Sequence, residues 1–374
     1  MKNWIRIAFA SSVLLACPML ATAQEKSPSP QLPKAALASL ENSTKRGLDY
    51  LKSTGQAKDG SFSAEAGPGV TALVLTSMLR NGVSLDDSSM SKGLKALEGF
   101  VKPDGGIYGN GRLMNYETCV GVLCFAEANQ KAGDGRYNKV LLDAKKFLMS
   151  LQYTDADSVE FGGVGYAGKG RPDLSNTAYL LEALQSLKVE PEDPAVQRAL
   201  VFISRCQNLK SQFNDSELAA KVNDGGFFYT IPSEKALESG DRSAPEGGLR
   251  SYGSMSYNGL KSMIYAGLKA EDPRVKAATT WIGKHYTLAE NPGMGKAGYY
   301  YYFHTFGAAL RAVGSETLTD TEGKEHRWKE DLVDALIRQQ KPDGSWQNEN
   351  RQWFENDKNL STAFALMALS YCRP

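Results

Sequence analysis

Three side chains in this sequence combine acid–base chemistry with a position near the start of a segment that reads as an apolar helix: Glu117, Tyr302 and His304. A carboxylate, a phenol and an imidazole can each donate or accept a proton beside a bound substrate. The positive ends of helix dipoles also collect at such positions and favour developing negative charge. If the protein is an enzyme, we expect Glu117, His304 and Tyr302 to be its catalytic residues.

Aromatic and polar residues that could bind a ligand gather near the same helix starts. Residues 299–302 are four consecutive tyrosines entering a helix, and they cannot all pack in a dry core with their hydroxyls satisfied, so some should line a cavity. Such a wall suits an isoprenoid chain or a sugar, and ordinary packing between hairpins is the alternative. The predicted ligand-binding residues are Asn115, Tyr116, Asp173, Arg250, Tyr252, Tyr257, Asn258, Tyr299 and Tyr300.

A helical repeat must position these side chains. Residues 340–346 read QKPDGSW, so a helix meets a Pro-Asp-Gly breaker and an aromatic residue before a second apolar helix begins at Thr362. This pattern is typical of a helical hairpin, and it recurs about six times. Each second helix has a small or aromatic anchor followed by apolar residues four and seven positions later; the anchors are Thr71, Thr118, Thr177, Ser256, Phe306 and Thr362.

A glycine-rich turn precedes each second helix. The turns lie at 59–62, 104–107, 161–164, 224–227, 295–299 and 343–346, of which the fifth is degenerate. Glycine supplies the positive φ that ends a helix, and aspartate can accept hydrogen bonds from backbone donors in the turn. We therefore interpret the aspartates of these turns as scaffold, and the following aromatic as an apolar plug between hairpins.

These repeats carry a resemblance to a known superfamily. Residues 340–346, QxxDGSW, and residues 56–62, QxxDGSF, resemble the Gln-Trp motif of the squalene cyclase and protein prenyltransferase repeat superfamily, and the likeness spans residues 45–374. It implies an all-α fold, an α/α toroid of about six helical hairpins. Inner helices would ring a central cavity, outer helices would face solvent, and any activity would be a terpene cyclase- or prenyltransferase-like isomerase or transferase reaction.

The resemblance also shows what is missing. Cyclases of this superfamily carry P-D-x-D-D-T-A at an inner-helix start, whereas residues 172–178 read PDLSNTA, with Ser175 in place of the acid. A hydroxyl cannot protonate an alkene, which disfavours ordinary cyclisation. Residues 117–119 and His304-Thr305 resemble the two halves of a prenyltransferase zinc site, but repeats two and five would face each other across the ring, too far for zinc bonds of about 2.0–2.3 Å. We expect no metal and no cofactor.

The N-terminus predicts export. Lys2 and Arg6 precede a short apolar run at 7–15, and residues 21–23 fit an A-x-A cleavage site, so we expect a signal peptide over residues 1–23 and a periplasmic or extracellular protein. Lipid anchoring at Cys17 is the alternative, because residues 14–17 loosely resemble a lipobox. We interpret residues 24–44, rich in proline and serine, as a tether, and residues 45–374 as the toroid. No later run reaches the roughly 18 apolar residues of a membrane span.

Bulk composition excludes one class of partner. The chain has 374 residues, 42% hydrophobic, and a formal net charge of +1, so there is no basic field for nucleic acid. The mature cysteines Cys119, Cys124, Cys206 and Cys372 fit small buried residues, and we do not expect the first two to form a disulfide with each other, because residues five apart diverge on a helix.

The function most consistent with these patterns is an exported repeat protein whose cavity binds an apolar, isoprenoid-like small molecule. Two alternatives remain. One is an extracellular polysaccharide lyase or hydrolase, in which a tyrosine and His304 would move protons while Arg250 neutralises an acidic sugar. The other is a non-catalytic scaffold that presents residues 208–250 to a protein partner, whose identity the sequence does not indicate.

Overall fold

The segments that follow the glycine turns form helices buried on all sides. Nearly every residue of α2 is buried, from Pro68 to Leu79, and α14 is similar. A helix that is apolar all round belongs inside a larger structure. These inner helices are α2 (Pro68–Arg80), α4 (Met114–Ala132), α6 (Leu174–Ser186), α10 (Gly253–Tyr265), α12 (Tyr299–Val313) and α14 (Lys358–Tyr371).

The intervening segments form amphipathic helices that cover the inner ones. Several begin at an aspartate whose side chain accepts hydrogen bonds from the first turn, as Asp87, Asp193 and Asp272 do, and such caps stabilise a helix start by about 1 kcal/mol. The outer helices are α1 (Lys34–Tyr50), α3 (Ser88–Glu98), α5 (Asn138–Ser150), α7 (Pro194–Arg205), α11 (Pro273–Lys284) and α13 (Trp328–Gln339).

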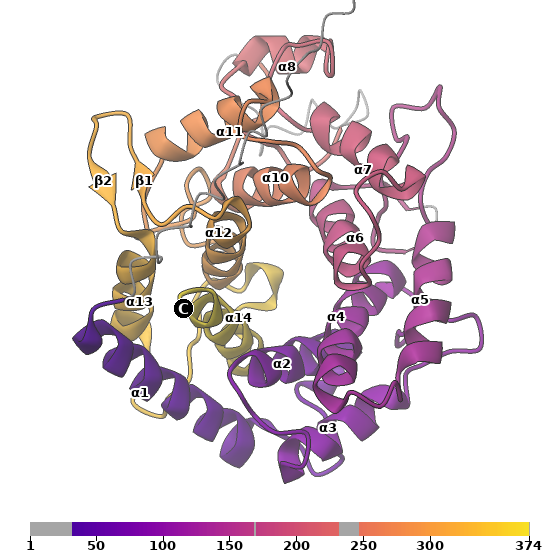
Figure 1. Cartoon of the computed structure of the whole chain (residues 1–374), viewed down its shortest axis with the longest axis vertical. Helices are drawn as coiled ribbons and strands as arrows, with labels where there is room; N and C mark the ends of the chain where they lie inside the picture. Colours follow the sequence, from indigo (N-terminus) through magenta and orange to yellow (C-terminus); the bar gives the residue numbers. More distant parts are fainter. Residues whose placement is uncertain (1–31, 168–169, 232–246, 374) are drawn as a thin grey trace, which may run out of the picture. The chain divides into compact units, whose positions relative to one another are not determined.

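The inner helices close into a ring. This computed structural model describes residues 32–167, 170–231 and 247–373. Each inner helix packs against the next in the order α2, α4, α6, α10, α12 and α14, and α14 packs against α2 (Figure 1). Each outer helix lies against inner helices, with α1 on α14 and α13 on α12 and α14. The predicted all-α toroid of helical hairpins is confirmed.

Short elements fill the connections. The longest of those described is α8 (Glu217–Val222). It lies in the segment 208–250 that we predicted as a partner-contact surface, part of which is outside the described residues. A two-residue antiparallel pair, β1 (Leu318–Thr319) and β2 (Glu325–His326), joins α12 to α13. The others are a π-turn, η1 (Leu51–Gly55), and two 3₁₀ turns, η2 (Ala64–Ala66) and η3 (Gln352–Phe354).

The first helix begins earlier than the predicted tether allowed. We placed a tether over residues 24–44, but α1 starts at Lys34. The serines and threonines of residues 34–44 suggested a flexible tether, but Ser43 and Thr44 are buried in α1. The Ser43 hydroxyl donates to Gln340 Oε1 at 3.0 Å. The predicted signal peptide lies outside the described residues. None of the described helices combines the length and apolar character needed to cross a membrane.

The small anchors of the inner helices have a common hydrogen-bonding role. In five repeats the anchor hydroxyl accepts a hydrogen bond from the backbone N–H of the last residue of the glycine turn, and that residue is buried. This bond fixes the plug residue against its own inner helix. The pairs are Thr71 with Phe62, Thr118 with Ile107, Thr177 with Val164, Ser256 with Phe227 and Thr362 with Trp346, at 2.9–3.2 Å.

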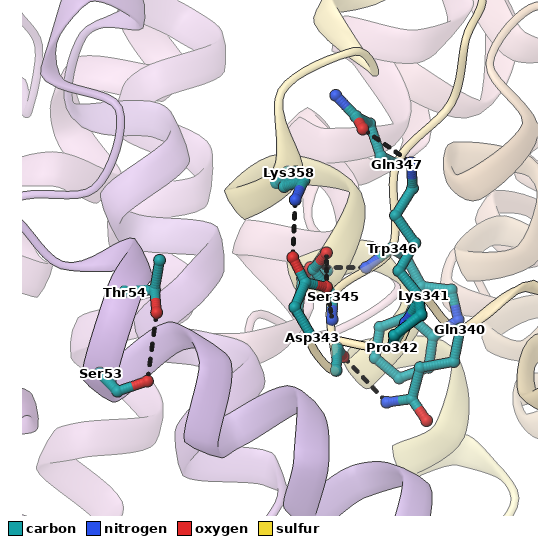
Figure 2. A network of polar contacts seen from close by, with 12 residues as sticks. Ser53, Thr54, Gln340, Lys341, Pro342, Asp343, Ser345, Trp346, Gln347 and Lys358 are labelled. Atoms are coloured by element: carbon teal, nitrogen blue, oxygen red, sulfur yellow. Dashed lines mark hydrogen bonds and ion pairs between the residues drawn. The ribbon is translucent and has the colours of Figure 1, made fainter.

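In four of the six repeats, the glutamine of the motif ties the turn to the next outer helix. Gln340 Nε2 donates to the Gly344 carbonyl in its own turn and to the Ser43 carbonyl of α1, each at 2.9 Å. Arg46 of α1 returns a bond to the Lys341 carbonyl at 2.8 Å. The last turn, in which Asp343 contacts Ser345 and Lys358 (Figure 2), thereby binds the first helix and closes the ring. Gln56, Gln152 and Gln207 make the equivalent bonds to α3, α7 and α11.

The turn glycines pack against the same outer helices. Gly344 has φ +88°, and a Cβ placed there would overlap the Arg46 carbonyl oxygen of α1. Only glycine permits both the left-handed conformation and this approach. The same overlap with the next outer helix occurs at Gly60, Gly105, Gly162 and Gly225.

Substituting Gly344 tests this packing. Gly82 has nearly the same φ, +84°, but open space where its Cβ would be. Gly82→Ala should therefore lower the free energy of unfolding only by the conformational cost of about 1–2 kcal/mol. Gly344→Ala should lose a further 1–3 kcal/mol, roughly, because its methyl group overlaps α1. Denaturant unfolding measures both, and equal losses would contradict a close contact between the turn and α1.

Candidate functional site

Polar side chains from neighbouring inner helices meet where these helices begin. Asp173 caps α6, and its carboxylate accepts hydrogen bonds from the Asn176 backbone N–H and side-chain amide, both at 2.8 Å. Asn115 at the start of α4 donates to Asn176 Oδ1 at 3.2 Å. This end of the ring therefore holds a buried network rather than isolated caps. Of the predicted ligand-binding residues, Asn115 and Asp173 come together here.

A second chain of contacts crosses the ring interior. The Ser175 hydroxyl of α6 lies 2.8 Å from the Tyr301 hydroxyl of α12, and Asn258 of α10 donates to the same Tyr301 oxygen at 2.7 Å. Ser175, which stands in place of the cyclase acid, is thus a hydrogen-bonding partner of Tyr301. The predicted residue Asn258 lies in the same group, and we call Ser175, Asn258 and Tyr301 the entrance triad.

The carboxyl of Asp173 has an unusual proton affinity. Burial raises its pKa to about 6, while hydrogen bonds from Asn176 and Tyr229 act in the opposite direction. Removing a carboxylate from water favours its neutral form. Asp173 is therefore a group whose charge changes in a mildly acidic range, although it is only 3% exposed.

An aromatic wall lies beside this network. We define it as Tyr116 of α4, Tyr179 of α6, Tyr301 of α12 and Phe364 of α14. Ring centroids are 5.2 Å apart for Tyr116 and Tyr179, 6.3 Å for Tyr179 and Tyr301, and 5.5 Å for Tyr301 and Phe364. Tyr116 and Tyr301 are partly exposed, whereas the other two are buried. Four aromatic side chains, one from each of four inner helices, therefore lie next to one another in the interior of the helical ring.

Charged residues form a layer further along the same helices. Lys261 of α10 and Glu182 of α6 make a buried ion pair at 2.6 Å. Arg80 of α2 pairs with Glu127 of α4 at 2.5 Å. These four residues, together with His304 of α12 and Tyr371 of α14, form what we call the ionic layer, to which each inner helix contributes one side chain.

The remaining contacts connect the ionic layer. Arg80 also donates to the Tyr371 hydroxyl at 2.8 Å, and that hydroxyl lies 3.3 Å from His304 Nδ1. Burial disfavours a charged Glu182, but Lys261, His304 and Arg80 outweigh it and hold the pKa of Glu182 at about 2. Burial lowers the pKa of His304 to about 3, so its imidazole is neutral at pH 7. The layer then contains two cations and two anions.

Helix geometry places the ionic layer below the aromatic wall. His304 follows Tyr301 by three residues, Lys261 follows Asn258 by three, and Glu182 follows Tyr179 by three. Three residues advance a helix by about 4.5 Å. Along α6, the residues that face the interior therefore belong first to the entrance triad, then to the aromatic wall and then to the ionic layer, over about two helical turns.

The predicted catalytic residues lie in separate places. Glu117 is buried and accepts the Gly109 N–H at 2.9 Å, and burial raises its pKa. Tyr302 donates to the Thr287 carbonyl at 2.7 Å, toward the outer layer. His304 lies in the ionic layer. No hydrogen bond joins any two of the three within the described residues, and their catalytic roles stay predictions.

The other predicted ligand-binding residues divide between the entrance and the outer layer. Tyr116 belongs to the aromatic wall and Tyr252 precedes α10. Tyr257 packs against Tyr302 and Phe306, between hairpins. Tyr299 donates to the Leu288 carbonyl at 2.6 Å and lines a separate hollow of about 570 Å³ on the outer side, and its neighbour Tyr300 is buried. Arg250 lies 3.5 Å from the Met294 sulfur.

Sequence reasoning missed a carboxylate that holds the tyrosine helix. The first residue before α12 is Gly298, which has no side chain to cap it. Glu355, buried in the last repeat, accepts the Tyr301 N–H at 2.7 Å instead. The two residues before Glu355, Trp353 and Phe354, have φ of +57° and +63°, a conformation that costs about 1–3 kcal/mol each. These two left-handed residues directly precede the carboxylate that caps α12. No local motif could have revealed it.

Metal ligation is not evident in this arrangement. Within the described ranges, no cluster of three or more His, Cys, Asp or Glu side chains is suited to hold a metal ion. The cysteines there, Cys119, Cys124, Cys206 and Cys372, are free and buried.

Comparisons with known proteins support the fold. No protein-family model and no curated protein sequence matches the chain. Solved structures that it resembles include the type II terpene cyclase MstE from Scytonema, with a TM-score of 0.51 and 16% identity over 90% of this chain and 98% of that one. Another is a family 76 glycoside hydrolase from a bovine Bacteroides thetaiotaomicron strain, with a TM-score of 0.56 and 11% identity over 88% of this chain and 77% of that one.

A third neighbour is an alpha-amylase from Clostridium perfringens, with a TM-score of 0.52 and 12% identity over 89% of this chain and 98% of that one. Identities this low establish a shared fold and no shared activity. The terpenoid cyclase-like toroid that the repeat motifs predicted is thus confirmed as a fold, and it is one on which both terpene and carbohydrate enzymes are built.

Breaking the buried ion pair tests the ionic layer. Lys261→Met leaves Glu182 buried without its partner, so the free energy of unfolding should fall by about 3–5 kcal/mol. The double variant Lys261→Met with Glu182→Leu should recover most of that loss, because no unpaired charge remains. Denaturant unfolding at pH 7 measures both, with Lys45→Met in the exposed pair with Asp49 as a control. A Lys261→Met protein as stable as wild type would show that the pair is not buried.

Proposed function

We propose that the end of the ring at which the inner helices begin binds an apolar, isoprenoid-like ligand. The observation that carries this proposal is the aromatic wall, in which Tyr116, Tyr179, Tyr301 and Phe364 converge from four inner helices. Ligand sites are concave and mostly apolar, with a few polar groups that fix orientation. The entrance triad and Asp173 supply those polar groups at one edge of the wall.

We infer that binding does not lead to protonation-initiated cyclisation. That reaction requires a strong acid aimed at an alkene. Ser175 stands where the superfamily has its acid, and it is already engaged with Tyr301 at 2.8 Å. Asp173 holds the helix cap instead. A binding protein, or an enzyme with a different chemistry, fits these residues better than a standard cyclase.

Comparison of folds supports a lipid and a sugar ligand equally, since one neighbour is a terpene cyclase and another a glycoside hydrolase. One observation favours the carbohydrate alternative. The pKa of Asp173 is raised to about 6 by burial, which suits a general acid. Against it, Asp173 is only 3% exposed and both its oxygens accept bonds from Asn176. We therefore favour the apolar ligand.

We propose further that the protein is exported and acts in the periplasm or outside the cell. The support is the charged, apolar and A-x-A pattern of residues 1–23. The chain recovered from the cell envelope or medium should have the mass of a protein beginning at Gln24. A lipid-modified chain beginning at Cys17 would replace cleavage after Ala23 with anchoring, and a full-length cytoplasmic chain would contradict export.

Binding is best tested at Tyr301. The mature protein should bind the C15 hydrocarbon farnesene, delivered from cyclodextrin and detected by native mass spectrometry. Tyr301→Ala removes one ring of the aromatic wall, and it should weaken binding about tenfold or more, as expected for loss of roughly 1.5–3 kcal/mol of buried aromatic contact. The matched control is Tyr137→Ala, which deletes a buried tyrosine at the start of the outer helix α5.

The control separates binding from folding. Tyr137→Ala should lower stability but leave affinity for farnesene close to that of wild type, because Tyr137 contacts Phe125 and Glu98 rather than the aromatic wall. Circular dichroism checks that both variants are folded. If wild-type protein ignores farnesene and releases sugars from a polysaccharide panel, the carbohydrate alternative replaces the proposal.

A further inference from the structure

The hydroxyls inside the ring are not equally satisfied. Tyr301 is bonded by Ser175 and Asn258, and Tyr371 by Arg80 and His304. The Tyr179 hydroxyl is buried and finds no hydrogen-bond partner among the described residues. A buried polar group without a partner is destabilising and uncommon in native proteins, so it calls for an explanation.

Tyr179 stands between the two polar regions of the interior. It follows Ser175 of the entrance triad by one helical turn and precedes Glu182 of the ionic layer by almost another. Tyr179 is 5% exposed, and its ring has Tyr116 edge-on at 5.2 Å and Tyr301 stacked at 6.3 Å. The free hydroxyl therefore lies within the aromatic wall, at the depth that the inner end of a bound ligand would reach.

The ionic layer below limits what that inner end can be. Lys261 is paired with Glu182, and Arg80 with Glu127, so each cation already has a carboxylate. The pKa of His304 is lowered by burial, which leaves it neutral. An anionic end, such as a carboxylate or a diphosphate, would find no unpaired cation among these residues and would lose its hydration. A neutral oxygen needs only one hydrogen bond.

We propose that the ligand is an amphiphile with an isoprenoid-like body and one neutral oxygen, an alcohol or a carbonyl, at its leading end, and that the Tyr179 hydroxyl contacts this oxygen. The inference rests on the proposed apolar-ligand function and adds the chemistry of the ligand's end. The partly exposed Tyr116 ring packs edge-on against Tyr179, and in this proposal it moves aside as the ligand enters. Tyr179 is a specificity residue in this account.

The test compares two probes that differ by one oxygen. Farnesol and farnesene are both C15 isoprenoids, but only farnesol carries a hydroxyl. Wild-type mature protein should bind farnesol roughly five- to tenfold more tightly, as one hydrogen bond to an otherwise unpaired group predicts. Tyr179→Phe removes the hydroxyl and keeps the ring, so affinity for farnesol should fall to that for farnesene, while affinity for farnesene stays unchanged.

A matched variant and two opposing outcomes make the result decisive. Tyr137→Phe removes the hydroxyl of a buried tyrosine outside the aromatic wall, and it should preserve the preference for farnesol. If Tyr179→Phe still prefers farnesol as strongly as wild type, the inference is overturned while the apolar-ligand site stands. If folded wild-type protein binds neither probe, the proposed function itself fails, and the inference fails with it.

Discussion

The structure depends on one contact, repeated around the ring: a glycine turn that lies directly on the backbone of the next outer helix and is tied there by a glutamine amide. Gln340 shows it most clearly, because its single side chain bonds the Gly344 carbonyl of its own turn and the Ser43 carbonyl of α1. The amide donates a hydrogen bond to two backbone carbonyls that would otherwise need water, and the glycine allows the turn to come close to the backbone of α1. This contact joins two residues that lie 297 positions apart in the sequence, Ser43 and Gln340.

Closure of the ring has a direct consequence for its interior. Helices buried on every side must bury polar groups as well, and each such group needs a partner. The entrance triad and the ionic layer meet this requirement by joining side chains from different inner helices. Because Glu182 and Lys261 satisfy each other between the neighbouring helices α6 and α10, the aromatic wall is left as the region best suited to an apolar ligand.

The fold could be predicted from the sequence because its determinants are local. The motif at 340–346 and the anchor Thr362 lie within one repeat, and their counterparts recur in phase. The site could be predicted only in part. Asn115 and Asp173 stand at helix starts and were found by position, whereas Tyr179 and Phe364 lie inside helices that are buried on nearly every side. Periodicity cannot tell which face of such a helix turns toward the ring.

The central claim is that the last turn holds the first helix in place, and hydrogen exchange tests it most directly. Gln340→Ala removes the bonds to α1, whereas Gln339→Ala alters the exposed residue before it and serves as the control. Loss of about 1.4 kcal/mol would speed exchange of the α1 amides tenfold. We expect that acceleration in Gln340→Ala alone. Unchanged exchange throughout α1 would contradict closure of the ring by this contact.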